Sequence, residues 1–475
     1  MADDLWRLSA VAAVDLLRRK EVKPAELIDA AAARIAAVDG KLNALPTLCL
    51  ERAHAHAKRL EHNGHPAEPG PGYLHGLPLA IKDLVEVEGV RTTHGSPVYK
   101  HHVSARSDYL VERLEANGGI VIAKSNTPEF GAGANTFNEV FGATRNPWDS
   151  RLTCGGSSGG AAVALATGQV WLAQGSDLGG SLRIPGSFCS IVGYRPSPGR
   201  VAHGPGQLPF SGLSVDGPMA RSVADVALML DAMAGEHPED PLSLPAPERS
   251  FLAATAMVQP PRRVAFSADL GIAPVVPEVA EICRQAAQSF ASLGARVEEA
   301  HPDLSDAPEL FQVLRAAQFA ATRGGLLPEH RDKLKEEVIW NIEEGFALDR
   351  ASIARAEVRR GELYRRAARF FRDYDLLLCP CVMLPPFPVG VRWVPEVEGR
   401  TFTTYVDWLM LTYAITLTAL PAVSVPCGFT KAGLPVGLQM VGAPRGDARL
   451  LGHAALFERL NKFAAMVPMD PVIRH

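Results

Sequence analysis

Short apolar runs alternate with amphipathic helical segments along most of this 475-residue chain, and this alternation constrains the fold more than any other feature. The runs GLPLAIKDLV, GGIVIAKSN and GQVWLAQGS are bounded by glycine or polar residues, as buried strands often are. Between them, DYLVERLEANGG carries an apolar stripe at helical spacing and ends at glycine. Further strands are predicted at RRVAFSAD, DLLLCP, AVSVPCGF and VGLQMVGA. Strands that alternate with helices predict an α/β fold with a central sheet, mixed or parallel.

Longer helical patterns occupy other parts of the chain. Residues 5–65 are predicted to be helical, with Pro24 in a first turn and apolar residues at helical spacing after it. In SVADVALMLDAMAG, Ser222 and Asp225 form a capping pair ahead of an apolar stripe. Residues 303–372 are mostly helical and rich in charge. Because the arginines near the end of this stretch alternate with acidic residues, they indicate a solvated helix face, not a nucleic-acid-binding patch.

Composition argues against several functional classes. A net charge of −4 gives no electrostatic case for binding nucleic acid or a membrane surface. The seven cysteines are odd in number, scattered and without a Cys-x-x-Cys pair, which favours reduced thiols in a cytoplasmic protein. The fourteen histidines form no zinc-binding spacing, so we expect no metal. The N-terminal residues are acidic, and their apolar stretch is broken by Asp15, which does not fit a signal peptide.

One uncharged segment, WLMLTYAITLTALPAVSVPCGF at residues 408–429, is long enough to cross a bilayer. Pro421, Pro426 and Gly428 lie near its end, where they would interrupt a membrane-spanning helix. The segment is therefore predicted to be a buried helix that runs into a buried strand.

A glycine-rich stretch, TCGGSSGGAAVALATGQVWLAQGSDLGGSLRIP at residues 153–185, places Ser157, Ser158 and Ser181 on two loops without a histidine nearby. Its glycines do not have the spacing of a phosphate-binding loop. The first two serines precede AAVALA, a predicted helix, so they are also candidate helix caps. Capping does not account for the second loop, GSDLGGS, where glycines free backbone N–H groups beside another serine.

The first serine loop also matches the G-x-S-x-G nucleophile elbow of α/β-hydrolases, with Ser157 at its centre. That fold needs a histidine later in the chain, and His453 is a candidate by position. However, His453 falls on the apolar face of the amphipathic segment DARLLGHAALFERL. A packed histidine therefore accounts for it better than a catalytic one.

A lysine offers a different base. Lys82 directly follows the apolar strand GLPLAI. With an unperturbed pKa of about 10.4, only about one lysine in 2,500 is neutral at neutral pH, but burial lowers this pKa by several units. A neutral Lys82 could accept a proton from a serine hydroxyl, as in the serine–lysine variant of triad chemistry.

The motifs PLAIKDL, GGSSGG and GSDLGGSLRIP, in this order, resemble those of the amidase signature family. The flanking segments AKSNTPEFG, FGATRNPWD, GSFCSIVGYRPSPGRV and ITLTALPAVSVPCGF are similar to that family as well. The resemblance covers nearly the whole chain and is weakest over residues 240–400. It implies one α/β domain over residues 1–475, with a central mixed sheet flanked by helices on both faces. Within that domain it implies an N-terminal helical arm (1–70), a core with the catalytic residues (72–235), a variable and largely helical region (236–400) and a C-terminal return to the sheet (401–475).

The resemblance also assigns roles. Ser181 would be the nucleophile, Lys82 the base, and Ser157, held by a cis peptide bond, the residue that passes protons between them. The backbone N–H groups of Leu178, Gly179 and Gly180 would stabilise the oxyanion, with Ser181's own N–H beside them. A weaker correspondence places the backbone of Gly131 near the substrate, and Asp177 and Arg183 would support the loop. Relatives often have threonine where this chain has Leu178, which makes this side of the pocket more apolar.

These features predict a cytoplasmic amidase that hydrolyses the carbon–nitrogen bond of a small non-peptide amide through a Ser181 acyl-enzyme, without a cofactor. Two alternatives stay open: the catalytic subunit of a tRNA-dependent amidotransferase, and a catalytically silent binding protein on the same fold. The resemblance also implies a possible homodimer. The sequence does not identify the substrate. Four aromatic residues could form a pocket wall that favours an apolar or aromatic acyl group, or could belong to the core: Phe402, Tyr405, Trp408 and Tyr413.

Overall fold

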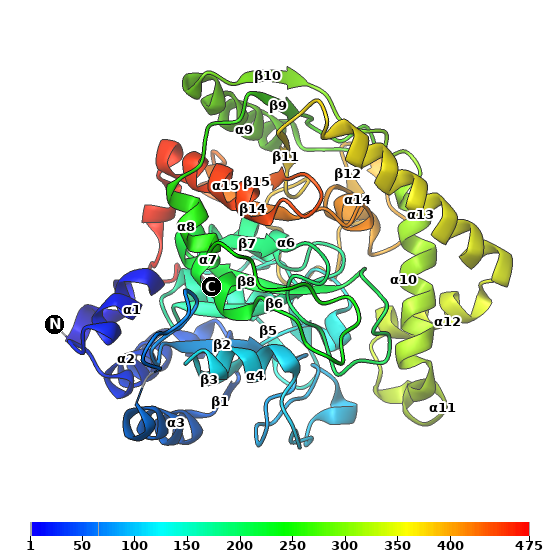
Figure 1. Ribbon diagram of the computed structural model, residues 1–475. Helices are drawn as coiled ribbons and strands as arrows, with labels where there is room; N and C mark the ends of the chain where they lie inside the picture. The colour runs from blue at the N-terminus through cyan, green and yellow to red at the C-terminus, as the bar shows by residue number, and fades with distance from the viewer. Residues whose placement is uncertain (1, 65, 475) are drawn as a thin grey trace.

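A single large sheet organises the molecule (Figure 1). The computed structural model describes residues 2–64 and 66–474. Over these residues, eleven strands pair in the order β1–β3–β2–β6–β8–β7–β14–β15–β11–β9–β10. Their bounds are β1 (Thr47–Leu48), β2 (Pro78–Lys82), β3 (Ile120–Ser125), β6 (Leu172–Asp177), β7 (Val192–Arg195), β8 (Val215–Ala220), β9 (Arg263–Phe266), β10 (Arg296–Glu299), β11 (Leu376–Pro380), β14 (Ala422–Phe429) and β15 (Pro435–Val441).

The sheet is mixed. Strand β2 runs parallel to both β3 and β6, whereas β8 is antiparallel to β6 and to β7. Two short hairpins lie outside it, β4–β5 (Phe137–Asn138 and Gly142–Ala143) and β12–β13 (Glu396–Val397 and Arg400–Thr401). The predicted α/β fold with a mixed central sheet is confirmed.

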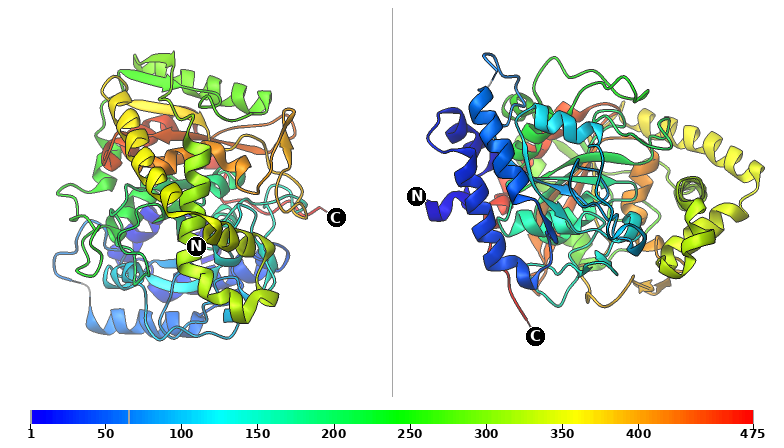
Figure 2. Two further views of the ribbon diagram at one scale, coloured as in Figure 1. Left: turned by 90° about the vertical axis from the view of Figure 1, so that its right-hand side faces the viewer. Right: turned by 90° about the horizontal axis from the view of Figure 1, so that it is seen from below.

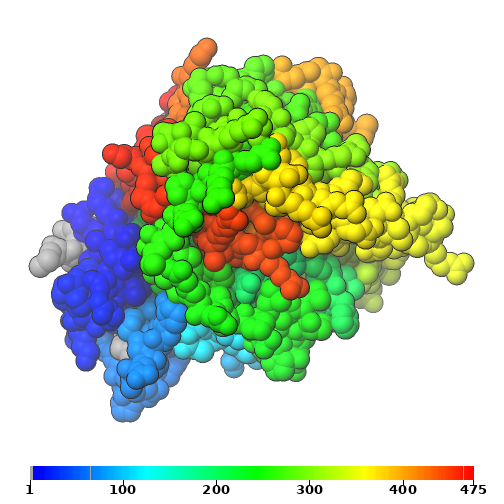
Figure 3. Space-filling view, turned by 45° about the horizontal axis from the view of Figure 1, so that its top comes forward, coloured from blue at the N-terminus to red at the C-terminus, as the bar shows by residue number. Residues whose placement is uncertain are grey.

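Helices flank this sheet on both sides (Figures 1 and 2). The N-terminal helices lie at one side of the molecule, and α10 to α13 lie at the opposite side, where α13 stands out from the surface (Figure 3). The bounds are α1 (Ala10–Arg18), α2 (Pro24–Val38), α3 (Leu50–Asn63), α4 (Tyr109–Ala116), α5 (Gly159–Ala166), α6 (Arg183–Cys189), α7 (Val223–Met233), α8 (Phe251–Ala256), α9 (Pro277–Gln288), α10 (Ala307–Arg323), α11 (Leu327–His330), α12 (Glu336–Ala347), α13 (Arg350–Phe370), α14 (Met410–Leu417) and α15 (Asp447–Asn461).

Local sequence signals set several of these elements. Pro24 opens α2, and the Ser222 hydroxyl accepts a hydrogen bond from the Asp225 N–H at the start of α7, as the capping pattern predicts. The Asp225 carboxylate accepts from the Val11 N–H and so joins α7 to α1. The uncharged segment 408–429 forms the buried helix α14 followed by β14, as predicted. Among the described residues, no helix is long and apolar enough to cross a membrane.

The centre of the fold is built from small residues. Helix α5 has the sequence GGAAVALA, and all eight of its residues are buried. It contacts β6 and α6, which flank the second serine loop. A helix with small side chains can pack close to its neighbours, so α5 brings the loop before it close to the loop that follows β6.

Candidate active site

Strand β2 ends at Lys82, whose side chain is fully buried. The strand is paired on both sides, and the Lys82 N–H donates to Gln174 Oε1 at 3.1 Å. These contacts fix the backbone at the carboxyl end of the strand. The ammonium group therefore has a defined position beneath the two serine loops.

Three hydroxyl groups surround Lys82 Nζ. Ser157 Oγ lies at 2.7 Å, Ser158 Oγ at 2.9 Å and Ser176 Oγ at 3.0 Å. Ser158 Oγ also lies 3.4 Å from the Ser176 carbonyl, to which it can donate, which leaves it an acceptor toward lysine. A neutral amine can donate to two hydroxyls and accept from one, and Ser157, the nearest, is suited to be the donor.

Burial lowers the pKa of Lys82 to about 7, against the opposing charges of Asp216 and Asp177. Among the described residues, no carboxylate forms an ion pair with Lys82 Nζ; its side-chain partners are the three hydroxyls. Lysine is thus a competent base near neutral pH. In the described residues, the hydrogen-bond partners of its protonated form are hydroxyl groups, and the charges of Asp216 and Asp177 act from farther away.

Ser157 connects Lys82 to the solvent-facing side of the site. The peptide bond between Gly156 and Ser157 is cis. Gly131 has a φ of +71°, and a Cβ added to it would lie 3.3 Å from Ser157 Oγ. A side chain at Gly131 would crowd the hydroxyl, so this glycine keeps Ser157 accessible.

Ser181 lies on the loop after β6 and is only partly buried. Its carbonyl accepts from the Ser158 N–H at 3.2 Å, which ties the two serine loops together. The side chains of Ser157 and Ser181 line the same cavity, but no hydrogen bond joins the two hydroxyls within residues 2–64 and 66–474. The structure thus brings all three predicted catalytic residues to one site.

The oxyanion loop differs from the prediction at one position. The Gly180 N–H donates to Asp177 Oδ1 at 2.9 Å, so it is already committed inside the protein. In the described part of the chain, the N–H groups of Leu178, Gly179 and Ser181 have no such acceptor. Gly180 instead shapes the loop: its φ is +122°, and an added Cβ would lie 2.3 Å from Thr412 Oγ1.

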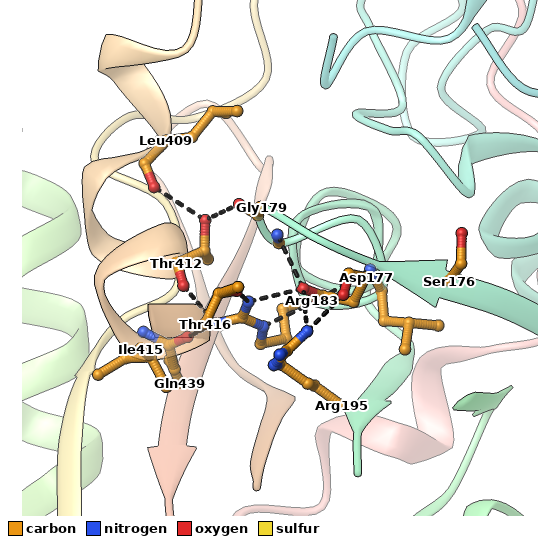
Figure 4. Close-up of polar contacts among 12 residues, drawn as sticks. Ser176, Asp177, Gly179, Arg183, Arg195, Leu409, Thr412, Ile415, Thr416 and Gln439 are labelled. Atoms are coloured by element: carbon orange, nitrogen blue, oxygen red, sulfur yellow. Dashed lines mark hydrogen bonds and ion pairs between the residues drawn. The ribbon is translucent and has the colours of Figure 1, made fainter. Parts of the chain in front are cut away.

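Asp177 anchors this loop from below (Figure 4). Its carboxylate forms a bidentate pair with Arg183 (2.9 and 2.8 Å) and also contacts Arg195 at 3.3 Å. All three side chains are fully buried. Although burial opposes ionisation, Arg183 and Arg195 hold the pKa of Asp177 well below its usual range. The predicted supporting role of Asp177 and Arg183 fits these contacts.

A second set of contacts joins the loop to α14. The Thr412 hydroxyl donates to the Gly179 carbonyl at 2.6 Å, and Arg183 Nη1 donates to the Thr412 carbonyl at 2.9 Å (Figure 4). Gln439 Oε1 on β15 accepts from the same arginine. The C-terminal part of the chain therefore fixes the loop that carries the candidate nucleophile.

A cavity of about 410 Å³ opens above these residues. Its lining includes Gly131, Ser157, Leu178, Gly179 and Ser181. Such a volume matches sites for small molecules.

Ionisable groups that the sequence did not single out also line the cavity. His203 Nδ1 lies 2.7 Å from Asp216 Oδ2; burial opposes its charge, but Asp216 raises the pKa of His203 to about 9. Burial raises the pKa of Asp108 to about 7. These residues follow no motif; a histidine in the glycine-rich loop AHGPGQ was the one available signal.

Two sequence-based hypotheses are not supported here. His453 is buried on α15, where burial lowers its pKa to about 4, and it does not line the cavity with Ser157. The hydroxyl of Ser158, which begins α5 as its N-cap residue, makes no capping hydrogen bond and contacts Lys82 instead. Contact with Lys82 therefore accounts for the positions of Ser157 and Ser158 better than a nucleophile elbow or a helix cap does.

The four aromatic residues of segment 401–420 belong to the core. Phe402, Tyr405, Trp408 and Tyr413 are at most 5% exposed and do not line the cavity. Leu409 from the same segment does. The alternative in which they form a pocket wall is therefore wrong. These residues do not support a preference for an apolar or aromatic acyl group.

No group of three or more His, Cys, Asp or Glu side chains in residues 2–64 and 66–474 is arranged to hold a metal ion.

Comparison with known proteins gives one consistent family. The amidase family profile matches residues 26–451. The chain is similar to an acylamidase of Rhodococcus erythropolis, 35% identical over 474 residues and 99% of each chain. It is also similar to a glutamyl-tRNA(Gln) amidotransferase subunit from Moorella thermoacetica, 36% identical over 487 residues, 97% of this chain and 98% of that one. Among solved structures, a bacterial aryl acylamidase of the amidase signature enzymes superposes with a TM-score of 0.88 at 28% identity, over 98% of this chain and 99% of that one.

Proposed function

Since this chain belongs to the amidase family and hydrolyses the carbon–nitrogen bond of an amide, we propose that Ser181, Ser157 and Lys82 carry out that reaction. Ser181 is the nucleophile, Ser157 carries protons and Lys82 is the base. The observation that carries the proposal is the buried Lys82 Nζ, 2.7 Å from Ser157 Oγ, with its pKa lowered to about 7.

In the first step, neutral Lys82 accepts the proton of Ser157 Oγ as Ser157 accepts the proton of Ser181 Oγ. The freed electron pair of Ser181 Oγ forms a bond to the amide carbonyl carbon. Substrate in the cavity would bring the two serine hydroxyls into line, since catalytic hydrogen bonds often tighten only in the complex. Protonated Lys82 is then held by the hydroxyls of Ser158 and Ser176.

The carbonyl oxygen becomes negatively charged and needs fixed donors. The N–H groups of Leu178, Gly179 and Ser181 supply them, since the Gly180 N–H is held by Asp177. The Asp177 network keeps the loop rigid, so the donors need no rearrangement when the charge develops.

Collapse of the tetrahedral intermediate breaks the carbon–nitrogen bond. The proton on Lys82 returns through Ser157 to the leaving nitrogen, which departs as ammonia or an amine. Water then attacks the Ser181 ester while its proton passes through Ser157 to Lys82, and the same proton returns to Ser181 Oγ as the ester bond breaks. The product leaves as the carboxylic acid and loses its proton to solvent, so each half-reaction restores the starting protonation states of the enzyme and no cofactor enters the balance.

The substrate class follows from the relatives and the cavity. An acylamidase and an aryl acylamidase are among the similar proteins, and the cavity volume is about 410 Å³. The volume supports a small amide substrate, and the two acylamidases support a stand-alone enzyme over an amidotransferase component. The seven free cysteines support a reducing compartment such as the cytoplasm.

The test measures hydrolysis of p-nitroacetanilide through the absorbance of the p-nitroaniline that it releases. The wild type is compared with the variants Ser181→Ala, Lys82→Ala and Ser157→Ala. Each of the three should lower kcat/KM by at least about 10³-fold, because relay members act as a unit. The control variant His453→Ala should keep wild-type kcat/KM, since that histidine lies outside the cavity.

Two results would contradict the proposal. Activity that survives Lys82→Ala would show that Lys82 is not the base of the reaction. Hydrolysis of glutamine in place of every acyl amide would instead favour the amidotransferase alternative, which the 36% identical relative keeps open.

A further inference from the structure

Helix α10 presents two arginines to the cavity. Arg315 and Arg323 both line it, together with Gln318, Phe319 and Thr322 between them. The other four residues follow Arg315 by three, four, seven and eight positions, which places all five on one face of the helix. This face of α10 forms one wall of the cavity.

Neither arginine has a carboxylate partner within residues 2–64 and 66–474. Arg315, which is 6% exposed, donates through Nε and Nη2 to the hydroxyl of Tyr405, at 3.2 and 2.6 Å. Arg323 donates through Nη1 to the neighbouring Thr322 carbonyl at 3.2 Å. A guanidinium removed from water without an opposite charge is unfavourable, so an anion that binds here gains more than it would at a solvated surface.

Aromatic rings hold both guanidinium groups in place. Arg315 lies over Phe319 at 4.7 Å from the ring centroid, and Arg323 lies over Phe130 at 4.8 Å. Stacking on a ring leaves the edge of a guanidinium open to acceptors, and within the described residues Arg315 Nη1 makes no hydrogen bond. The arginines are therefore oriented before any ligand arrives.

The acidic residues of the cavity already have cationic or hydrogen-bonding partners. Glu86 Oε1 contacts His94 Nε2 at 2.9 Å, and Asp216 pairs with His203. Asp108 accepts from the Glu86 N–H at 3.3 Å, and burial raises its pKa to about 7. Glu86 and Asp216 therefore each contact a histidine and Asp108 contacts a backbone N–H, whereas Arg315 and Arg323 have no acidic side chain beside them in the described residues.

Arg315 and Arg323 line the same cavity as Ser157 and Ser181. Phe311, one turn before Arg315, would lie 3.2 Å from a Cβ at Gly179. Phe130, under Arg323, precedes Gly131, which lies against Ser157 Oγ. A small substrate with its carbonyl at Ser181 can therefore extend along α10 to the guanidinium groups.

We propose that the preferred substrates are amides that carry a carboxylate remote from the scissile bond, and that Arg315 and Arg323 bind this carboxylate. The inference rests on the proposed function, because it takes the cavity at Ser181 as the substrate site. The specificity for a carboxylate then resides on α10, separate from the residues that break the bond.

The test compares matched amides that differ in one charge. On the acyl side, the p-nitroanilide of glutaric acid is compared with that of pentanoic acid. On the amine side, 4-acetamidobenzoate is compared with 4-methylacetanilide. The wild type should favour the carboxylate member of at least one pair, and Arg323→Gln should lower that kcat/KM ratio by about 10- to 100-fold, the worth of a charged hydrogen bond.

The matched control is Arg331→Gln, which removes the same charge from an exposed arginine paired with Glu343 outside the cavity. It should leave the ratio unchanged. Arg315→Gln should act as Arg323→Gln does, and Arg323→Lys should restore part of the preference. Circular dichroism melting of each variant separates loss of folding from loss of recognition.

Failure of this inference is distinct from failure of the proposed function. If neutral anilides are hydrolysed without preference for a carboxylate in either pair, or if the preference survives both Arg→Gln variants, the arginine assignment is wrong while the amidase mechanism stands. If no anilide is hydrolysed, calorimetry with the Ser181→Ala protein and the same four amides decides. Tighter binding of the carboxylate member that depends on Arg323 supports the assignment, and equal or absent binding overturns it.

Discussion

The lowered pKa of Lys82 predicts a specific pH dependence of the reaction. Because burial lowers this pKa to about 7, the neutral base predominates above neutral pH and is lost as the pH falls. The second-order constant kcat/KM should therefore rise with pH through an apparent pKa near 7 and then level off.

The size of the rise follows from the titration of one group. With a pKa of about 7, the neutral fraction of Lys82 increases about tenfold between pH 6 and 8 and changes little above that. An unburied lysine, with a pKa of about 10.4, would give a rate that keeps rising about tenfold per pH unit up to pH 10. The two cases differ most clearly between about pH 8 and 10.

The assay is kcat/KM for an uncharged anilide over about pH 5 to 10, in buffers of constant ionic strength. Asp216→Asn should move the rising limb to lower pH, because the charge of Asp216 opposes the effect of burial on Lys82. Asp108→Asn is the control, since burial raises the pKa of Asp108 to about 7 as well. A limb that vanishes in Asp108→Asn, or a rate that still climbs steeply at pH 9 and above, would refute the assignment to Lys82.

Three further predictions concern the scaffold. Gly180→Ala should destabilise the protein by roughly 1–3 kcal/mol and abolish amide hydrolysis, because its Cβ would lie 2.3 Å from Thr412 Oγ1. Differential scanning calorimetry measures the loss of stability, and the control is Gly40→Ala, whose Cβ meets no atom within 4 Å. Asp177→Asn should cost about 3–5 kcal/mol in urea unfolding, since it leaves two buried arginines without their carboxylate; a cost below about 1 kcal/mol would contradict that role. Ser222→Ala removes the cap of α7 and should cost about 1 kcal/mol with kcat/KM unchanged, so a loss of activity beyond that of stability would show the cap has another role.

The sequence predicted the parts of the site that motifs carry. Lys82, Ser157 and Ser181 lie at one site because β2, α5 and β6 are neighbours, and glycine-flanked serines indicated the two loops. The predicted amidase activity and the α/β fold are confirmed by the family match and by the similar structures. Short motifs were informative because their chemistry depends on backbone shape, which glycine spacing reveals.

What the sequence did not reveal depends on contacts between distant segments. Strand β8 has the sequence VDGPMA, and aspartate, glycine and proline are rare in strands, so the sequence did not predict it. The strand is nevertheless paired on both sides. Gly180 was expected to donate to the oxyanion, but the carboxylate of Asp177 folds back to accept its N–H.

The wall formed by α10 was also missed. Arg315 lies in a long charged helical region, and its partner Tyr405 is 90 residues away. Periodicity indicates which residues of a helix share a face, but it does not indicate that the face lines a cavity. Only the packing of α10 beside Gly179 makes these arginines part of the site.

The most direct test of the central claim is the position of the covalent adduct formed with an activated fluorophosphonate. Intact-mass measurement and peptide mapping would be carried out on the wild type, Ser181→Ala, Ser157→Ala, Lys82→Ala and His453→Ala. We expect one adduct, on Ser181, that persists in His453→Ala and is lost or strongly slowed in the other three variants. An adduct on Ser157 that persists in Ser181→Ala and requires His453 would contradict the assignment of Ser181 as the nucleophile.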